Sequence, residues 1–172
     1  MGLKQVNTNT VSSAVSSVQL TGIDANNAYM VAFHNVSPTT NEVDLMGRVL
    51  ESGTPNTTSN YDRAVIGFRS NNTFLEIASV NQNKWDLGNN VGTGTSETIN
   101  GIIYIYNAYN SSEYTHITLH QSELDHTPTH VGFAGGYAFT STSVVNGIEL
   151  FFDSSSTIAT GSFTLYKVIW YG

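Results

Sequence analysis

The chain contains no cysteine among its 172 residues. A disulfide framework is therefore excluded, together with a thiolate nucleophile and a zinc site built on cysteine. A chain of this length buries about 70% of its unfolded surface when it folds as one unit, so it needs no covalent staple. We expect a single domain spanning residues 1–172.

Charge is also scarce. Charged residues make up 11% of the sequence, against about a quarter in an average domain. The six basic residues are scattered and are outnumbered by thirteen acidic ones, whereas phosphate binding needs clustered Lys and Arg, so nucleic acid is excluded as a partner. A surface of hydroxyls and amides remains, which suits hydrogen bonding to sugars or to a protein neighbour.

Two long-range patterns are missing as well. No apolar run reaches the roughly 20 residues that span a membrane, and no secretion signal is visible at the N-terminus. No window of 11 residues shows the apolar spacing of an amphipathic helix without interruption. We expect no membrane partner and an all-strand fold.

What the sequence has instead is alternation of apolar and polar residues with period two. The expected strands cover residues 3–20, with a kink at Ser12 and Ser13, then 29–36, 42–51, 61–68, 74–80, 97–106, 114–120, 130–140, 147–152 and a last strand from 162. Both faces of 97–106 are apolar or aromatic, so this strand should be central. The spacing of 8 to 12 residues predicts an antiparallel β-sandwich of jelly-roll type.

The C-terminal segment, residues 143–172, reads as one closing hairpin. Residues 147–152 alternate, a serine-rich turn follows, and the last strand is apolar on both faces near its end. Such a strand is expected inside a sheet or against a neighbouring subunit and not at an open edge. The small-residue segment 1–20 could be exchanged between chains or make an assembly contact.

Residues 81–98 are the longest poorly periodic stretch, rich in Asn, Gly and Thr around the lone Trp85. A loop of this length in a compact domain is usually functional or braced by a partner.

Histidines and carboxylates are the candidates for chemistry. His116 and His120 would share one face of a strand about 13 Å apart, too far to bind one metal ion. His126 and His130 flank a turn, so a metal site would need a fold or a symmetry axis to gather them, and surface histidines are the default. We expect no metal and no cofactor.

Glycoside hydrolysis would need two acids about 5 to 9 Å apart across a cleft, and the nearest pairs in sequence are Glu123 with Asp125 and Asp44 with Glu51. Solvated loop acids explain these pairs equally well. No motif of a serine nucleophile occurs, so we expect no enzyme.

Aromatic side chains are the better candidates for binding. Tyr104 and Tyr106 lie near one strand end, Trp85 lies in the irregular segment, and Trp170 lies near the C-terminus. Such rings stack on sugars, anchor protein interfaces or fill a core. We take Trp85, Tyr104, Tyr106 and Trp170 as candidate interface anchors, with all three roles left open.

Several segments together carry a family resemblance. They are 144–152, 158–166, 3–20, 21–24, 29–35 followed by Ser37 and Pro38, and 59–61. In this pattern the chain resembles small virion structural proteins of tailed bacteriophages, especially marine and cyanobacterial ones. Residues 72–98 depart from any such pattern.

The resemblance implies a virion component that is made in the host cytoplasm and binds other virion proteins. The expected role is capsid decoration on the particle exterior, as a homotrimer. The alternative is a tail-fibre or receptor-binding module, in which loops 52–60 and 81–98 contact host surface polysaccharide.

Overall fold

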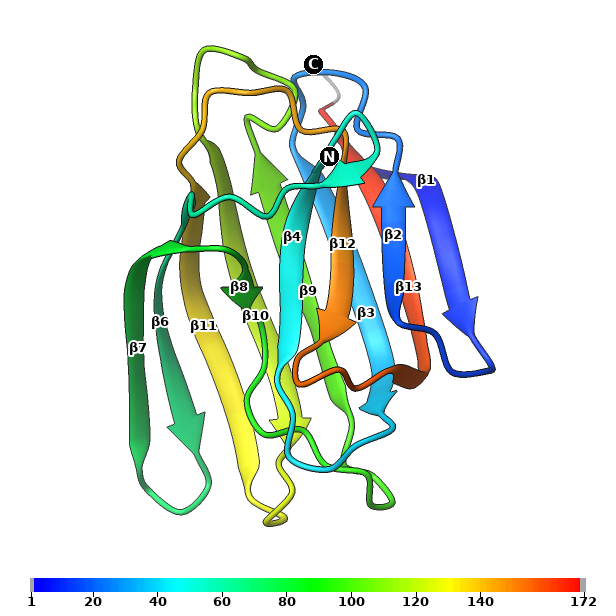
Figure 1. The fold of residues 1–172 in the computed structure, drawn as a ribbon, viewed down its shortest axis with the longest axis vertical. Coiled ribbons are helices and arrows are strands. Elements are labelled where there is room, and N and C mark those ends of the chain that lie inside the picture. Colours follow the sequence, from blue (N-terminus) through cyan, green and yellow to red (C-terminus); the bar gives the residue numbers. More distant parts are fainter. Residues whose placement is uncertain (1, 171–172) are drawn as a thin grey trace.

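The computed structural model describes residues 2–170, which form two antiparallel sheets packed face to face (Figure 1). The large sheet has the order β1 (Gly2–Val11), β13 (Ile158–Ile169), β3 (Tyr29–Pro38), β9 (Ile99–Tyr106), β10 (Thr115–Leu124), β11 (His130–Phe139), β6 (Tyr61–Arg69) and β7 (Phe74–Gln82). The small sheet has the order β2 (Ser17–Thr21), β12 (Gly147–Phe152), β4 (Leu45–Glu51) and β5 (Thr54–Pro55), and β8 (Trp85–Asp86) also pairs with β4.

The strands wind between the two sheets in a nested order. The first strand lies beside the last, β1 against β13, and the second lies beside the next to last, β2 against β12. β3 then pairs with β13, and β4 with β12. This is the winding of a jelly roll, so the predicted antiparallel β-sandwich is confirmed.

The predicted closing hairpin is wrong. β12 lies in the small sheet and β13 in the large sheet, so the turn at residues 153–157 carries the chain from one sheet to the other. Alternation marks each strand but cannot tell which neighbour it bonds. The expectation for the last strand is confirmed, because β13 lies between β1 and β3.

The predicted break in segment 3–20 is where the chain changes sheets. β1 ends at Val11 and β2 begins at Ser17. Val15 bridges to Ile158 through a pair of backbone hydrogen bonds of 3.1 and 2.8 Å. Both strands pair within their own chain, and exchange of this segment between chains stays a prediction.

β9 lies between β3 and β10, which confirms that segment 97–106 forms a central strand. Ile99, Ile103 and Ile105 point inward and are fully buried. The alternate residues Ile102, Tyr104 and Tyr106 therefore point to the outer side of the sheet.

Four strands, β10, β11, β6 and β7, extend the large sheet beyond β9. The small sheet does not reach the margin formed by β6 and β7 (Figure 1). Part of the missing layer is supplied by segment 81–98, where β8 pairs with β4 and contributes Trp85 and the buried Leu87. The segment is thus braced by its own chain.

One hydrophobic core joins the two sheets across the described residues, with side chains from all the long strands. Positions 1, 171 and 172 of the predicted domain lie outside the described residues. Within residues 2–170 there is no helix of the length and apolar character that membrane crossing requires.

Adjacent glycines on β11 offer a test of this layering. A Cβ on Gly135 would lie 2.5 Å from both the Cα of Val65 and the carbonyl oxygen of Ala64, whereas a Cβ on Gly136 would meet nothing closer than 3.8 Å. We expect Gly135→Ala to lower the free energy of unfolding by about 1–3 kcal/mol through overpacking. Gly136→Ala, the matched control, should lower it by nothing, since alanine orders a strand at less entropic cost. Urea denaturation measures both, and equal loss in the two variants would contradict the assignment of inner and outer faces.

Candidate interaction face

The outer side of the large sheet is the broadest surface of the described chain that no element covers. We call it the outer face, defined by two rows of residues paired from strand to strand. One row is Tyr166, Met30, Tyr104, Thr118, Gly136, Ala64 and Ala78, and the other is Thr164, Ala32, Ile102, His120, Ala134, Ile66 and Glu76. It points away from the viewer in Figure 1.

The outer face carries little charge. In the two rows only Glu76, near the β7 margin, has a formal charge. Tyr104 and Tyr106 stand on it with rings stacked at a centroid distance of 6.5 Å and an interplanar angle of 23°. Tyr106 is 38% exposed. The structure thus brings these two predicted anchors together on one surface.

Beside the tyrosines the surface is unusually low. Gly132, Ala134, Gly136 and Ala138 occupy successive outward positions of β11. A Cβ on Gly132 or Gly136 would meet only ordinary contacts, at 3.6 and 3.8 Å, so the chain's own packing does not require glycine at either position. Glycine weakens a strand by about 0.5–1 kcal/mol relative to alanine. Glycine within a strand is typical of places where another molecule approaches closely.

Three shallow, open depressions lie along this surface. One lies between β10 and β6, lined by His116, Thr118, Gly136 and Asp62. The second is lined by Asn100, Ile102 and His120, and the third by Ile66, Ala78 and Ala134. A small-molecule site buries most of its ligand in an enclosed cavity. Open depressions on a sheet suit a broad, flat partner instead.

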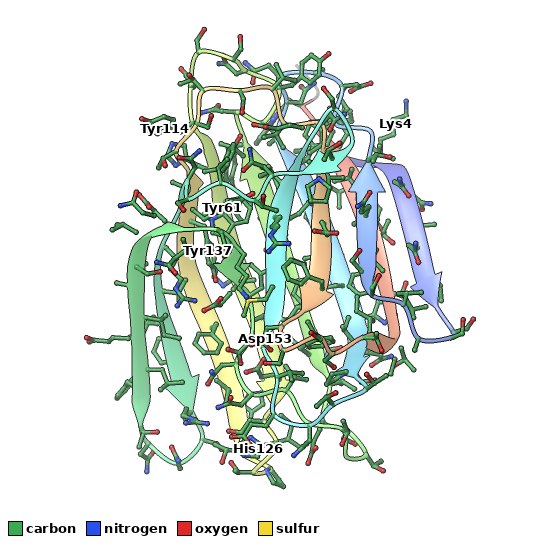
Figure 2. The ribbon with its side chains drawn as sticks, viewed as in Figure 1. Lys4, Tyr61, Tyr114, His126, Tyr137 and Asp153 are labelled. Atoms are coloured by element: carbon green, nitrogen blue, oxygen red, sulfur yellow. The ribbon has the colours of Figure 1, made fainter. Side chains whose placement is uncertain are left out.

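Trp85 is not an interface anchor, and that prediction is wrong for this fold. Its side chain is fully buried, edge-on to Tyr61 at 4.9 Å and to Tyr137 at 6.0 Å between ring centroids. The indole N–H donates to the carbonyl of Ala138 at 3.3 Å. Figure 2 labels Tyr61 and Tyr137, the two rings that hold it. Burial of so large an apolar ring outweighs the polar character of the surrounding segment.

Trp170 lies just beyond β13 and is 68% exposed. The structure does not bring it to the tyrosine pair, because β3 separates β13 from β9. Its role as an anchor stays a prediction.

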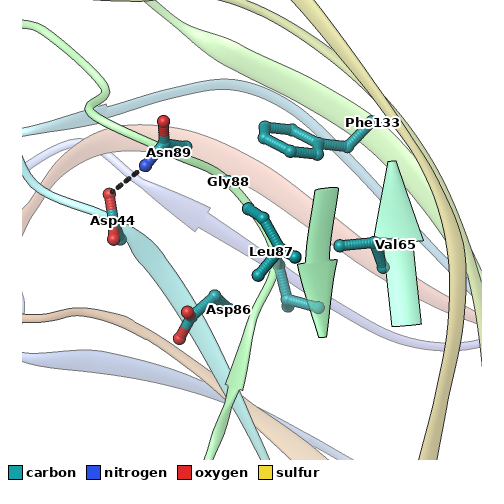
Figure 3. Close-up of a pocket in the computed structure, with 8 residues that line it drawn as sticks. Asp44, Val65, Asp86, Leu87, Gly88, Asn89 and Phe133 are labelled. Carbon is teal, nitrogen blue, oxygen red and sulfur yellow. Dashed lines mark hydrogen bonds between the residues drawn. The ribbon is translucent and has the colours of Figure 1, made fainter. Parts of the chain in front are cut away.

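The acids do not form an open cleft. Asp44 and Asp86 line a cavity of about 20 Å³ between the sheets, beside Leu87, Asn89 and Phe133 (Figure 3). This volume holds about one water molecule. Glu51 ends β4 while Asp44 precedes it, so the two carboxylates are about 23 Å apart along the strand, too far for a glycosidase pair.

Glu123 points inward from β10 and is 1% exposed. The backbone N–H of Asn89 lies 3.0 and 3.3 Å from its two carboxyl oxygens. Burial, opposed by this hydrogen bond, raises the pKa of Glu123 to about 8. Burial also raises the pKa of Asp44, which accepts a hydrogen bond of 2.6 Å from the N–H of Asn90. These two acids fasten segment 81–98 to both sheets.

Asp125 is fully buried and forms an ion pair with Arg69. Burial opposes its charge, but hydrogen bonds from Thr127 and Thr129 and from Arg69 together lower the pKa of Asp125. Each partner of the predicted pair Glu123 and Asp125 thus has a structural task in closing the turn between β10 and β11.

The histidines stay apart. His116 and His120 point outward from β10, as predicted, and both are exposed. His130 Nε2 lies 2.8 Å from the hydroxyl of Ser122, and His126 Nε2 lies 3.5 Å from a carboxyl oxygen of Glu42. Among residues 2–170 no three His, Cys, Asp or Glu side chains gather as a metal site would require.

Sequence reasoning overlooked the row of small residues on β11. The alternation of His130, Gly132, Ala134, Gly136 and Ala138 with larger residues is visible in the sequence. Once the segment is read as a strand, this pattern indicates one face kept low.

The fold and this surface define the chain as a jelly-roll sandwich with an extended, weakly charged sheet face. No family model and no curated protein matches it. A search of solved structures returns "Structure of infectious bursal disease virus Gx strain", 11% identical, covering 96% of this chain and 39% of that chain with a TM-score of 0.17. The chain spans about two fifths of that protein, and a TM-score this low supports no argument about function.

The buried Glu123 makes stability depend on pH. Between its ordinary pKa of 4.5 and about 8 the folded state keeps a proton that the unfolded state releases. The free energy of unfolding therefore falls as pH rises through this window, by at most about 1.4 kcal/mol per pH unit, and levels off above it. In Glu123→Gln that contribution should vanish.

Urea denaturation at several pH values from 5 to 9 measures the difference between wild type and variant. Asp44 and Asp125 are present in both proteins, so the difference isolates Glu123. The exposed Glu113→Gln is the matched control and should follow wild type. A constant difference between Glu123→Gln and wild type at all pH values would contradict the assignment.

Proposed function

We propose that this protein is a non-enzymatic virion component of a tailed bacteriophage that binds the particle exterior through its outer face. The observation that carries the proposal is the uncovered face of the large sheet, with the stacked Tyr104 and Tyr106 beside low positions such as Gly136. The sequence resemblance to phage virion proteins supports the choice of partner.

The physical basis is burial of a flat surface. Charged residues are depleted and aromatic residues enriched at the centres of protein interfaces. The tyrosine pair offers rigid area at low entropic cost, and hot spots are enriched in such rings. Binding to the assembled shell and not to free subunits would stabilise the particle by mass action. The homotrimer implied by the resemblance stays part of this proposal.

A receptor-binding module for host polysaccharide is the second candidate. Tyrosines beside Asn100 and Thr118 on a shallow surface could also stack on sugar rings and bond their hydroxyls. Burial of Trp85 removes the aromatic side chain on which loop 81–98 would depend for that role. We therefore favour attachment to the virion.

The test is sedimentation of the purified chain with virions that lack it. The double variant Tyr104→Ala and Tyr106→Ala should weaken binding by about tenfold or more, since each ring is truncated at the interface centre. Tyr109→Ala is the matched control, because Tyr109 is similarly exposed at 43% but lies in the loop after β9.

Unchanged binding by the double variant would reject the outer face as the attachment surface. Binding of wild type to host polysaccharide but not to virions, lost in the same double variant, would support the second candidate instead.

A further inference from the structure

β7 is an open edge of the large sheet. It pairs with β6 on one side only, and it forms the margin at the left of Figure 1. An edge strand carries a row of unpaired N–H and C=O groups that can bond another strand. How the chain treats its two sheet edges therefore shows which one is open to pairing.

The opposite edge of the same sheet, β1, is protected. Lys4 projects from it (Figure 2), and the pairing with β13 shifts between Gln5 and Asn7. Lysine and bulges are two devices that stop edges from pairing. Between these features and Val11 the exposed residues are Thr and Asn. This edge is polar and irregular.

The β7 edge lacks every one of these devices over its regular part. From Phe74 to Ser79 it has no Lys, Arg or Pro, a single acid, Glu76, and an unbroken register with β6. The irregularity comes only afterwards, where Val80 and Asn81 together oppose Asp62.

The β7 edge is also apolar. Phe74 is 63% exposed and Val80 62% exposed, and Phe68 on β6 packs edge-on against Phe74 at 5.8 Å. On the inner side Leu75 and Ile77 are only partly buried against the core. Pairing with another strand would cover apolar side chains on both faces at once.

The backbone groups that point to the open side can be identified. The N–H of Arg69 donates to the carbonyl of Thr73 at 3.1 Å. In an antiparallel ladder every second residue bonds the same neighbour, so Leu75, Ile77 and Ser79 bond β6. The free groups belong to Phe74, Glu76, Ala78 and Val80.

We propose that β7 pairs antiparallel with β7 of a second copy, about a two-fold axis at Ile77. Phe74 then lies opposite Val80 of the second copy, and Glu76 lies opposite Ala78. All four free residues meet as hydrogen-bonded pairs, giving about eight backbone hydrogen bonds. The two Ile77 side chains meet on the inner face beside the axis.

The neighbouring registers are worse for stated reasons. An axis at Glu76 would set the two Glu76 carboxylates directly opposite each other, and like charges in that position are destabilising. An axis at Ala78 would draw the bulge at Val80 and Asn81 into the ladder and leave Phe74 facing Gln82. The sequence of β7 thus selects one self-complementary register. This inference does not depend on the proposed function.

The test is the mass of the purified chain by light scattering on a sizing column, at concentrations up to about 100 μM. Wild type should have twice the 18.6 kDa of one chain. Ala78→Glu would oppose Glu76 of the second copy at two symmetric positions and should raise the dimer dissociation constant by about tenfold or more. Ala78→Lys would oppose the same acid with a base and should keep the dimer or tighten it.

Ala64→Glu is the matched control, because Ala64 is exposed on the same face one strand inward and pairs with Ala78. It should leave the mass unchanged. Combining Glu76→Lys with Ala78→Glu should restore the dimer lost in Ala78→Glu alone. Thermal melting checks that each variant is folded.

A monomeric or trimeric wild type would overturn the proposal. So would equal dissociation of the Ala78→Glu and Ala78→Lys variants, or a mass that neither changes. Opposite responses of the two variants, together with rescue by the double exchange, are what the register requires.

Discussion

The structure depends on the burial of Trp85 between the two sheets. The four strands added beyond β9 have an apolar inner side that the strands of the small sheet alone do not cover. Segment 81–98 fills that space because Trp85 packs against Tyr61 and Tyr137, which come from β6 and β11. A single ring therefore joins the extension to the small sheet through β8.

Polar contacts hold the same segment at its other end. Glu123 and Asp44 accept hydrogen bonds from the backbone of Asn89 and Asn90, and the hydroxyl of Tyr137 donates to the carbonyl of Asp86 at 2.7 Å. Buried acceptors that are bonded to backbone N–H groups fix a loop without a strand ladder. Because the inner side is filled in this way, the outer side needs no covering layer from its own chain.

The sequence was sufficient for the strands and for the central position of β9, since period-two alternation and an apolar run on both faces are local signals. It was not sufficient for the sheet to which each strand belongs. β12 and β13 are adjacent in sequence and lie in opposite sheets, because the nested winding is decided by long-range pairing.

The candidate site divides in the same way. Tyr104 and Tyr106 were identified correctly as neighbours on one face because both lie on one strand, two residues apart. Trp85 was misplaced because its polar neighbours in sequence conceal the rings that reach it from β6 and β11. Glu123 was read as a loop acid, although alternation with Gln121 along β10 places it inward. Contacts between distant segments, and not composition, decided both cases.

The two surfaces inferred here are geometrically compatible. Pairing through β7 about an axis perpendicular to the sheet places the outer faces of both copies on the same side of one continuous sheet, since paired residues share a face. Each copy would then present its own Tyr104 and Tyr106 to the same partner surface. Two linked sites bind with an effective concentration set by their fixed spacing, so avidity can exceed the affinity of one face by 10² or more without any new contact. A weak, flat face of low charge is therefore enough for lasting attachment to a repetitive shell, provided that the edge at β7 fixes the distance between copies.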